Sequence, residues 1–313
     1  MSERNARAWP SFVVMLWLTA ACTSPYPTSP TLTPRSTVLP SATQGRKVEP
    51  APTVSATPLS SPMIWRVASV DPSAAEPDSA ERSPDGEWTA SSFGTYPPIV
   101  MQVARADGSV TWEITYAGED WFEVWLRPVH WSVDGRYLYF TLAPFVDGFV
   151  LYMNGSGLQR LDLVSGEMTE LLAGAGLLQS FSISPDSTQL VFFRVSEDET
   201  WLVLRDLEDG RETEWKLADG PVQAGAVRWS PDGTAFVLLA SEGFSYEEVL
   251  TDVVLLDLRR MAPKTVLQDA PRIRHVNWTD ANSLYLEDYD GSGWLLDLTS
   301  GEMVRTPTPS SAP

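Results

Sequence analysis

The chain is poor in the residues that most catalytic and metal sites need. Its 313 residues include one cysteine and two histidines, so it cannot form an internal disulfide and offers too few donors for a zinc site of His and Cys ligands. It also lacks a Gly-x-Ser-x-Gly nucleophile turn and a glycine-rich phosphate loop. His130 and His275 lie at predicted strand ends, where we expect packing rather than a Ser-His-Asp site. These absences favour a protein that is not an enzyme and has no cofactor.

Positive charge is scarce as well. The sequence has 22 Lys and Arg against 41 Asp and Glu, which gives a formal net charge of −19 at pH 7. An excess of this size repels nucleic acid and anionic lipid headgroups, and no cluster of basic residues offsets it. We therefore exclude nucleic acid as a partner.

Long hydrophobic runs are missing too. The run Ser11–Ala21 follows two arginines, is too short to cross a bilayer and ends in small residues, which is typical of a secretory signal. It leads into Leu-Thr-Ala-Ala-Cys, ending at Cys22, which resembles the lipobox of bacterial lipoproteins, although Thr19 stands where Leu is usual. The resemblance implies that residues 1–21 are a signal peptide and that Cys22 is lipidated, so that the protein is exported and faces the periplasm or the cell exterior. Ordinary cleavage after Ala21 is the alternative.

A long segment after Cys22 has few large apolar side chains. Pro, Thr and Ser make up 24 of the 40 residues in 23–62. Such a segment cannot bury enough surface to offset its ordering entropy, so we interpret 22–62 as a disordered tether. Residues 306–313 form a short tail of similar composition. The folded part is then 63–305, which is long enough for one well-buried domain.

Within 63–305, one turn motif recurs between apolar segments. The copies begin 49, 52, 46 and 49 positions apart. Four of them carry residues that favour a type I turn and the fifth is degenerate: Ser83-Pro84-Asp85-Gly86, Ser132-Val133-Asp134-Gly135, Ser184-Pro185-Asp186-Ser187, Ser230-Pro231-Asp232-Gly233 and Thr279-Asp280-Ala281-Asn282. A period of 40 to 50 residues with strands around each turn predicts an all-β fold, a β-propeller of four-stranded antiparallel blades.

The strands around the turn also repeat. The second strand of a repeat is a continuous apolar run, which predicts burial on both faces: 137–142, 189–193, 235–240 and 284–286. The third strand ends in Asp-Leu, at Asp162, Asp206, Asp257 and Asp297. Trp131, Trp229 and Trp278 occupy the same position before the turn, where we expect them to pack between blades.

This pattern of Trp-Ser-Pro-Asp-Gly, apolar strand and Asp-Leu strand resembles the TolB-like propeller repeats. The resemblance covers about 83–305 and implies a propeller; it says little about activity. Five repeats are visible, so we predict five blades, with the six blades usual in that family as the alternative. The strand-like segment 63–70 could be the missing inner strand of the first blade or an extra strand that helps to close the ring.

Acidic residues collect in the predicted connections between second and third strands, which contain no Lys or Arg. They are Asp147, Glu197, Asp198, Glu199, Glu242, Glu247, Glu248, Asp252, Glu287, Asp288 and Asp290. The opposite ends of the blades carry the basic residues Arg105, Arg136, Arg211, Arg259, Arg260 and Lys264. We interpret the acidic set as a docking face for a partner; a solvated surface is the alternative.

Two chemical roles of these acids remain open, calcium binding and hydrolysis. Asp288, Asp290 and Ser292 match the first half of a calcium loop, but Thr299 stands where a bidentate acid is needed, so they are a weak calcium candidate and a polar hairpin is the alternative. A propeller-type hydrolase could use two loop carboxylates near the axis, with Glu247, Glu248, Asp288 and Asp290 as the first suspects.

The sequence thus favours a non-enzymatic, membrane-tethered extracytoplasmic propeller. We expect it to be a monomer that binds a protein or small ligand in the cell envelope. The hydrolase and a purely structural envelope component are the alternatives.

Overall fold

A computed structural model describes residues 65–71, 75–118, 123–144, 153–174, 179–220, 222–241 and 250–306. They belong to a single unit of the chain and contain strands and turns only. None of them forms a helix that is long and apolar enough to cross a membrane. The predicted signal, Cys22 and the tether lie outside the described residues, as does the tail beyond Thr306.

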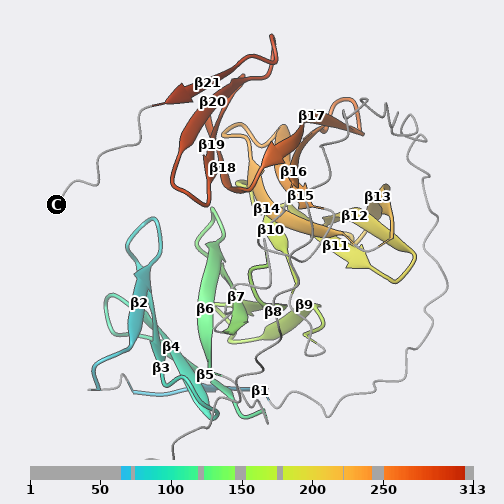
Figure 1. Ribbon diagram of the computed structural model, residues 1–313. Helices are drawn as coiled ribbons and strands as arrows, with labels where there is room; N and C mark the ends of the chain where they lie inside the picture. Colours follow the sequence, from blue (N-terminus) through green and yellow to red (C-terminus); the bar gives the residue numbers. More distant parts are fainter. Residues whose placement is uncertain are drawn as a thin grey trace, which may run out of the picture. The chain divides into compact units, whose positions relative to one another are not determined.

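The strands form five antiparallel sheets that follow one another along the chain (Figure 1). The first sheet has the order β1-β5-β4-β3-β2, with β1 Trp65–Ser69, β2 Ser79–Arg82, β3 Trp88–Phe93, β4 Ile99–Arg105 and β5 Thr111–Tyr116. The second comprises β6 Val124–Trp131, β7 Tyr137–Pro144, β8 Ser156–Asp162 and β9 Met168–Leu172. The third comprises β10 Phe181–Ile183, β11 Gln189–Val195, β12 Glu199–Asp206 and β13 Glu212–Asp219. The fourth comprises β14 Gln223–Trp229, β15 Ala235–Ser241, β16 Leu250–Asp257 and β17 Ala262–Pro271. The fifth comprises β18 Ile273–Asp280, β19 Ser283–Asp288, β20 Gly293–Asp297 and β21 Met303–Thr306.

This topology is that of a β-propeller, and its five sheets confirm the predicted repeats. Of the two roles left open for the segment 63–70, the extra strand is confirmed and the missing inner strand is wrong. The first blade already has an inner strand, β2, although all four of its residues are exposed. β1 pairs with β5 at the opposite edge of the sheet, so it is an extra, fifth strand. Its Trp65 packs against Tyr116, with ring centroids 4.9 Å apart, and against Phe140 of the second sheet at 5.8 Å.

The repeated turn is built by its serine and aspartate. In the fourth sheet, the Ser230 hydroxyl donates to Asp232 Oδ1 at 2.6 Å, and Gly233 N donates to Ser230 O at 2.9 Å. Gly233 has φ 67°, a left-handed conformation that costs glycine little. Ser187 replaces glycine in the third copy and adopts φ 63° all the same. The same serine-to-aspartate bond recurs from Ser83, Ser132 and Ser184.

The Asp-Leu ending locks the third strand to this turn. Asp257 Oδ1 accepts the Arg259 N–H at 2.9 Å, and Leu258 N donates to Thr234 O, just after the turn, at 3.0 Å. Equivalent pairs occur at Asp162-Leu163, Asp206-Leu207 and Asp297-Leu298. The dipeptide therefore recurs because both of its residues have a structural role. The Asp side chain shapes the turn after the third strand, and the Leu backbone N–H binds the residue that follows the repeated turn.

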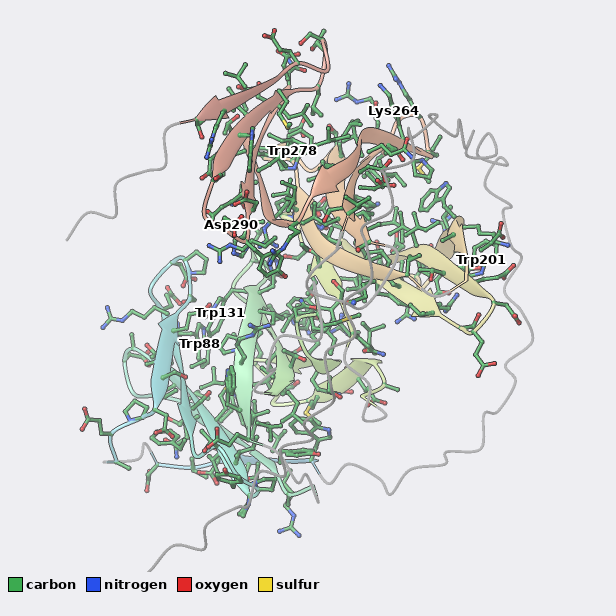
Figure 2. All side chains as sticks on the ribbon, viewed as in Figure 1. Trp88, Trp131, Trp201, Lys264, Trp278 and Asp290 are labelled. Atoms are coloured by element: carbon green, nitrogen blue, oxygen red, sulfur yellow. The ribbon has the colours of Figure 1, made fainter. Side chains whose placement is uncertain are left out.

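Four hydrophobic clusters join consecutive sheets. The second strands β7, β11 and β15 are buried on both faces as predicted, whereas β19 alternates and its Tyr285 is only partly buried. Trp131 belongs to the cluster between the first and second sheets, together with Trp88 (Figure 2). Trp229 packs in the cluster between the third and fourth sheets and Trp278 in that between the fourth and fifth. The three tryptophans thus lie between blades, as expected.

Candidate functional site

The first strands of three sheets carry a β-bulge beside an arginine. The register of β6 shifts between Pro128 and His130, next to Arg127. In β14 the shift ends at Arg228, and in β18 it contains Arg274. A bulge adds an unpaired residue and redirects the neighbouring side chains, and bulges are common beside functional sites.

The bulge in β14 contains a strained residue. Ala226 has φ 50°, which is uncommon for a residue with a Cβ atom. Such a conformation costs about 1–3 kcal/mol and persists only where the surrounding structure imposes it. The strain falls two residues before Arg228, so it accompanies the change in direction of that side chain.

These strands line a pocket of about 450 Å³, which we call the inner-strand pocket. Its walls come from the second to fifth sheets and consist of Arg127, Met153, Asn154, Ser180, Phe181, Ala226, Val227, Arg228, Arg274, His275 and Tyr289. Of these eleven described residues, three are arginines and none is a carboxylate. Met153, Asn154 and Tyr289 belong to connections between second and third strands, which places the pocket at the acidic end of the blades.

Arg127 is held by a neutral partner. Its guanidinium donates to the backbone carbonyl of Asn154. Burial lowers the pKa of Arg127, and the negative charge of Glu81 on β2 partly opposes that shift. The side chain is therefore a partly desolvated cation that donates a hydrogen bond to an uncharged oxygen.

Arg228 has the same character. Its Nε donates to Asn277 Oδ1 at 3.2 Å and its Nη1 to the Val227 carbonyl at 3.0 Å. The residue keeps an exposed surface, yet the surrounding protein removes enough water from the guanidinium to lower the pKa of Arg228. A guanidinium with uncharged partners retains its full charge for a ligand.

The third arginine is partly neutralised. Arg274 forms an ion pair with Glu287 of the neighbouring strand β19. Next to it, His275 keeps an exposed surface, yet partial desolvation lowers its pKa; the charges of Arg274 and Arg228 add to that shift and the charge of Glu287 opposes it. The described residues that line the pocket carry a net positive charge, although the chain has a formal net charge of −19.

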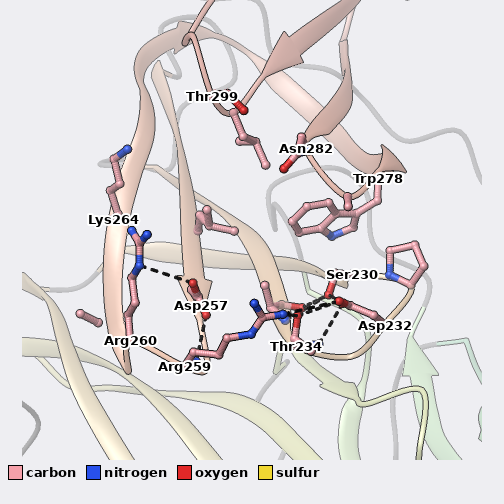
Figure 3. Close-up of a pocket in the computed structure, with 16 residues that line it drawn as sticks. Ser230, Asp232, Thr234, Asp257, Arg259, Arg260, Lys264, Trp278, Asn282 and Thr299 are labelled. Carbon is pink, nitrogen blue, oxygen red and sulfur yellow. Dashed lines mark hydrogen bonds and ion pairs between the residues drawn. The ribbon is translucent and has the colours of Figure 1, made fainter.

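A second hollow, of about 470 Å³, lies between the fourth and fifth sheets at their turns (Figure 3). Arg259, Arg260 and Lys264 stand on one side of it, and Trp278 and Asn282 on the other. Each of its arginines already has a carboxylate nearby, at 3.9 Å for Arg259 and Asp232 and at 3.6 Å for Arg260 and Asp257. Both arginines are largely exposed. This hollow is therefore a weaker candidate than the inner-strand pocket.

Apart from Asp288, which is buried, the residues of the predicted acidic face fall into three groups. Glu197, Asp198 and Asp290 are exposed. Three others have partners within their own sheet: Glu199 with Lys216 at 2.6 Å, Asp252 with the Asp269 N–H at 2.9 Å, and Glu287 with Arg274. Asp147, Glu242, Glu247 and Glu248 lie outside the described residues. A role of these acids in docking stays a prediction.

Asp288 and Asp290, which are candidates both for calcium binding and for hydrolysis, lie in one turn. Asp288 is buried, and its Oδ1 accepts the N–H groups of Asp290 at 2.9 Å and Ser292 at 2.8 Å. This carboxylate therefore shapes a polar hairpin. In the part of the chain that the structure describes, no three His, Cys, Asp or Glu side chains are grouped as metal ligands.

Sequence reasoning missed the arginines of the inner-strand pocket. It treated the first strands as packing elements, and it expected basic residues only at the opposite ends of the blades. The usable signal was an arginine inside an apolar first strand, as in Trp125-Leu126-Arg127-Pro128 and Ala226-Val227-Arg228-Trp229. The bulges that turn these side chains into one cavity depend on strand register, which the sequence pattern does not reveal.

No protein-family model and no curated protein matches the chain. Solved propellers resemble it weakly. The tricorn protease is 15% identical with a TM-score of 0.47, TolB from Acinetobacter baumannii 17% with 0.42, and the periplasmic gluconolactonase of Pseudomonas aeruginosa 14% with 0.44. The matches cover 72%, 71% and 73% of this chain, but only 26% of the protease chain, 53% of the TolB chain and 68% of the gluconolactonase chain.

Proposed function

We propose that the chain is a non-enzymatic β-propeller that is exported, tethered to a membrane through lipid on Cys22, and binds a ligand or protein in the cell envelope. The inner-strand pocket carries this proposal. Its volume of about 450 Å³ is in the range of small-molecule sites, and the strained Ala226 lies in its wall two residues before Arg228. Arginine recognises ligands well but is a poor general acid or base, because it does not give up its proton near neutral pH.

The hydrolase alternative has less support. A glycosidase-like mechanism needs two carboxylates that flank the scissile bond. The described residues that line the inner-strand pocket include no carboxylate, and the adjacent Glu287 is paired with Arg274; Glu247 and Glu248 lie outside the described residues. Of the four suspected acids, Asp288 is engaged by backbone N–H groups and Asp290 is exposed on its turn. This arrangement fits recognition better than hydrolysis.

The proposed role combines the tether with the propeller. A Pro-rich segment of some forty residues would let the domain reach several tens of Å from the membrane surface. The exposed acids Glu197, Asp198 and Asp290 could then favour a basic partner, with the inner-strand pocket available to a ligand. We propose that the propeller acts as a monomer without nucleic acid.

The test separates binding from turnover. Detergent-solubilised full-length chain is used to capture partners from envelopes and is incubated in parallel with chromogenic esters, lactones and glycosides. We expect specific capture and no turnover. The matched variant is Arg228→Gln, with Arg260→Gln on the other end of the blades as control. Turnover that the parent shows and Arg228→Gln lacks would make the protein an enzyme.

A further inference from the structure

We infer that the inner-strand pocket binds a small organic oxyanion, a molecule with a carboxylate or phosphate group and an apolar or aromatic body. This inference rests on the proposed function and names the class of its ligand. It follows from the charge, the geometry and the size of the pocket.

The charge of the wall selects an anion. Arg127 and Arg228 use uncharged oxygens as their hydrogen-bond acceptors. Each guanidinium has five N–H donors arranged as a planar fork that fits carboxylate and phosphate oxygens. Desolvation of these cations is costly; Glu81 offsets part of that cost at Arg127, and an anionic ligand would offset more of it at both arginines.

The cations also come from separate sheets and converge. The shift in the pKa of His275 has contributions from the charges of both Arg228 on β14 and Arg274 on β18, so the three groups share one electrostatic environment. Arg127 adds a third sheet. Like charges from different strands repel one another, so their collection in one cavity is better explained by a bound anion than by folding.

The size and the remaining walls exclude an inorganic ion as the whole ligand. A cavity of about 450 Å³ is much larger than a single phosphate. The lining also includes Phe181, Met153 and Tyr289, which provide apolar and aromatic contacts. The ligand therefore has an anionic head at the arginines and a body against these side chains.

Glu287 acts as an internal competitor at this site. It occupies Arg274, whereas Arg127 and Arg228 form no ion pair with the residues that the structure describes. The substitution Glu287→Gln replaces the carboxylate with an uncharged amide. This would release Arg274 for the ligand and still leave an oxygen that can accept a hydrogen bond. The inference therefore predicts that Glu287→Gln strengthens binding, which a role in folding alone would not do.

The experiment uses probes that share a ring and differ in charge. Binding of benzoate, phenyl phosphate, benzamide and benzylamine to detergent-solubilised full-length chain is measured by calorimetry and by the shift in Tm, with inorganic phosphate as the head alone. We expect the two ring anions to bind and the neutral and cationic probes to bind at least about tenfold more weakly. The preferred anion identifies whether carboxylate or phosphate is the natural head.

The variants locate the site. Arg228→Gln and Arg127→Gln should each weaken anion binding about tenfold or more, Arg228→Lys less, and Glu287→Gln should strengthen it. Arg260→Gln removes the same charge from an arginine that is 80% exposed elsewhere and should leave binding unchanged. An equal loss in Arg260→Gln would mean that net charge, not the pocket, attracts the anion.

Two results would overturn the inference. One is a parent chain that binds no ring anion at millimolar concentration; the other is equal binding of benzamide with no effect of the arginine variants. Benzamide binding that Arg228→Gln abolishes would reject the anion but keep the proposed binding function. Turnover of a chromogenic substrate would reject the binding function while leaving the anion preference standing.

Discussion

Trp229 tests whether the blades pack as the structure has them. Its indole lies in the cluster between the third and fourth sheets, with its ring centroid 4.9 Å from that of Phe236 at an interplanar angle of 59°. Truncation of a fully buried tryptophan to alanine costs about 3–5 kcal/mol. Trp229 is only partly buried, which moves the expected loss toward the lower end of this range.

The indole N–H reduces the loss further. Trp229 Nε1 is buried and has no hydrogen-bond partner within the described part of the chain. A buried donor of this kind costs about 1–3 kcal/mol, and Trp229→Ala removes that cost together with the ring. We therefore expect Trp229→Ala to lower the free energy of unfolding by about 2–3 kcal/mol, which corresponds to a fall in Tm of about 4–12 °C for a domain of this size.

Trp229→Phe is the matched variant. It keeps an aromatic ring against Phe236 and removes only the unpartnered N–H and part of the ring, so its stability should stay within about 1 kcal/mol of the parent. Urea unfolding is followed by circular dichroism of the strands, because the substitution itself alters tryptophan fluorescence. A loss below about 1 kcal/mol in Trp229→Ala would refute the packing, and equal losses in both variants would mean that the N–H is bonded.

Three further predictions concern the anchor, the repeated turn and the acidic face. Cys22→Ser should move the protein from the membrane fraction to the soluble exported fraction, and unchanged partitioning would reject lipidation. Hydrogen bonds from Ser230 and Thr234 lower the pKa of Asp232 to about 2, so the folded state favours its charged form; stability from this group should be complete above about pH 4 and be lost as the pH falls toward 2. Thermal unfolding across this range should therefore depend less on pH in Asp232→Asn, and parallel curves would contradict the assignment. Replacing Glu197, Asp198 and Asp290 with their amides should slow association with a cationic peptide at low salt and raise Tm slightly; rates that match the parent at every ionic strength would leave these acids as solvated surface.

The repeated features were predictable because each has a local cause. The repeated turn needs only four adjacent residues. Its serine hydroxyl bonds to an aspartate two residues later, and the next residue adopts a positive φ. The turn at Ser230 therefore has the same signature in sequence and in structure. Its spacing then determined the number of sheets. The two-sided burial of β15 followed from its composition, since Phe236 to Leu239 are each 0% exposed.

Features that depend on pairing between distant strands were not predictable. β1 is strand-like in sequence, but whether it pairs with β3 or with β5 depends on which edge is free after the first sheet has formed. Likewise, Glu199 and Glu287 look like exposed loop acids until their cross-strand neighbours Lys216 and Arg274 are known. A charge count along the chain therefore overstated the free negative charge of the acidic end.

The inner-strand pocket shows why the same limit applies to function. An arginine in a first strand can turn toward solvent, a neighbouring blade or the pocket, and a one-residue shift in register decides among them. Here β6, β14 and β18 each shift once beside an arginine, and Ala226 adopts a strained conformation where β14 does so. Regular strands would avoid that strain and keep the ladder hydrogen bonds intact. Bulges beside arginines in three first strands are difficult to explain by stability, and a common ligand gives them one cause.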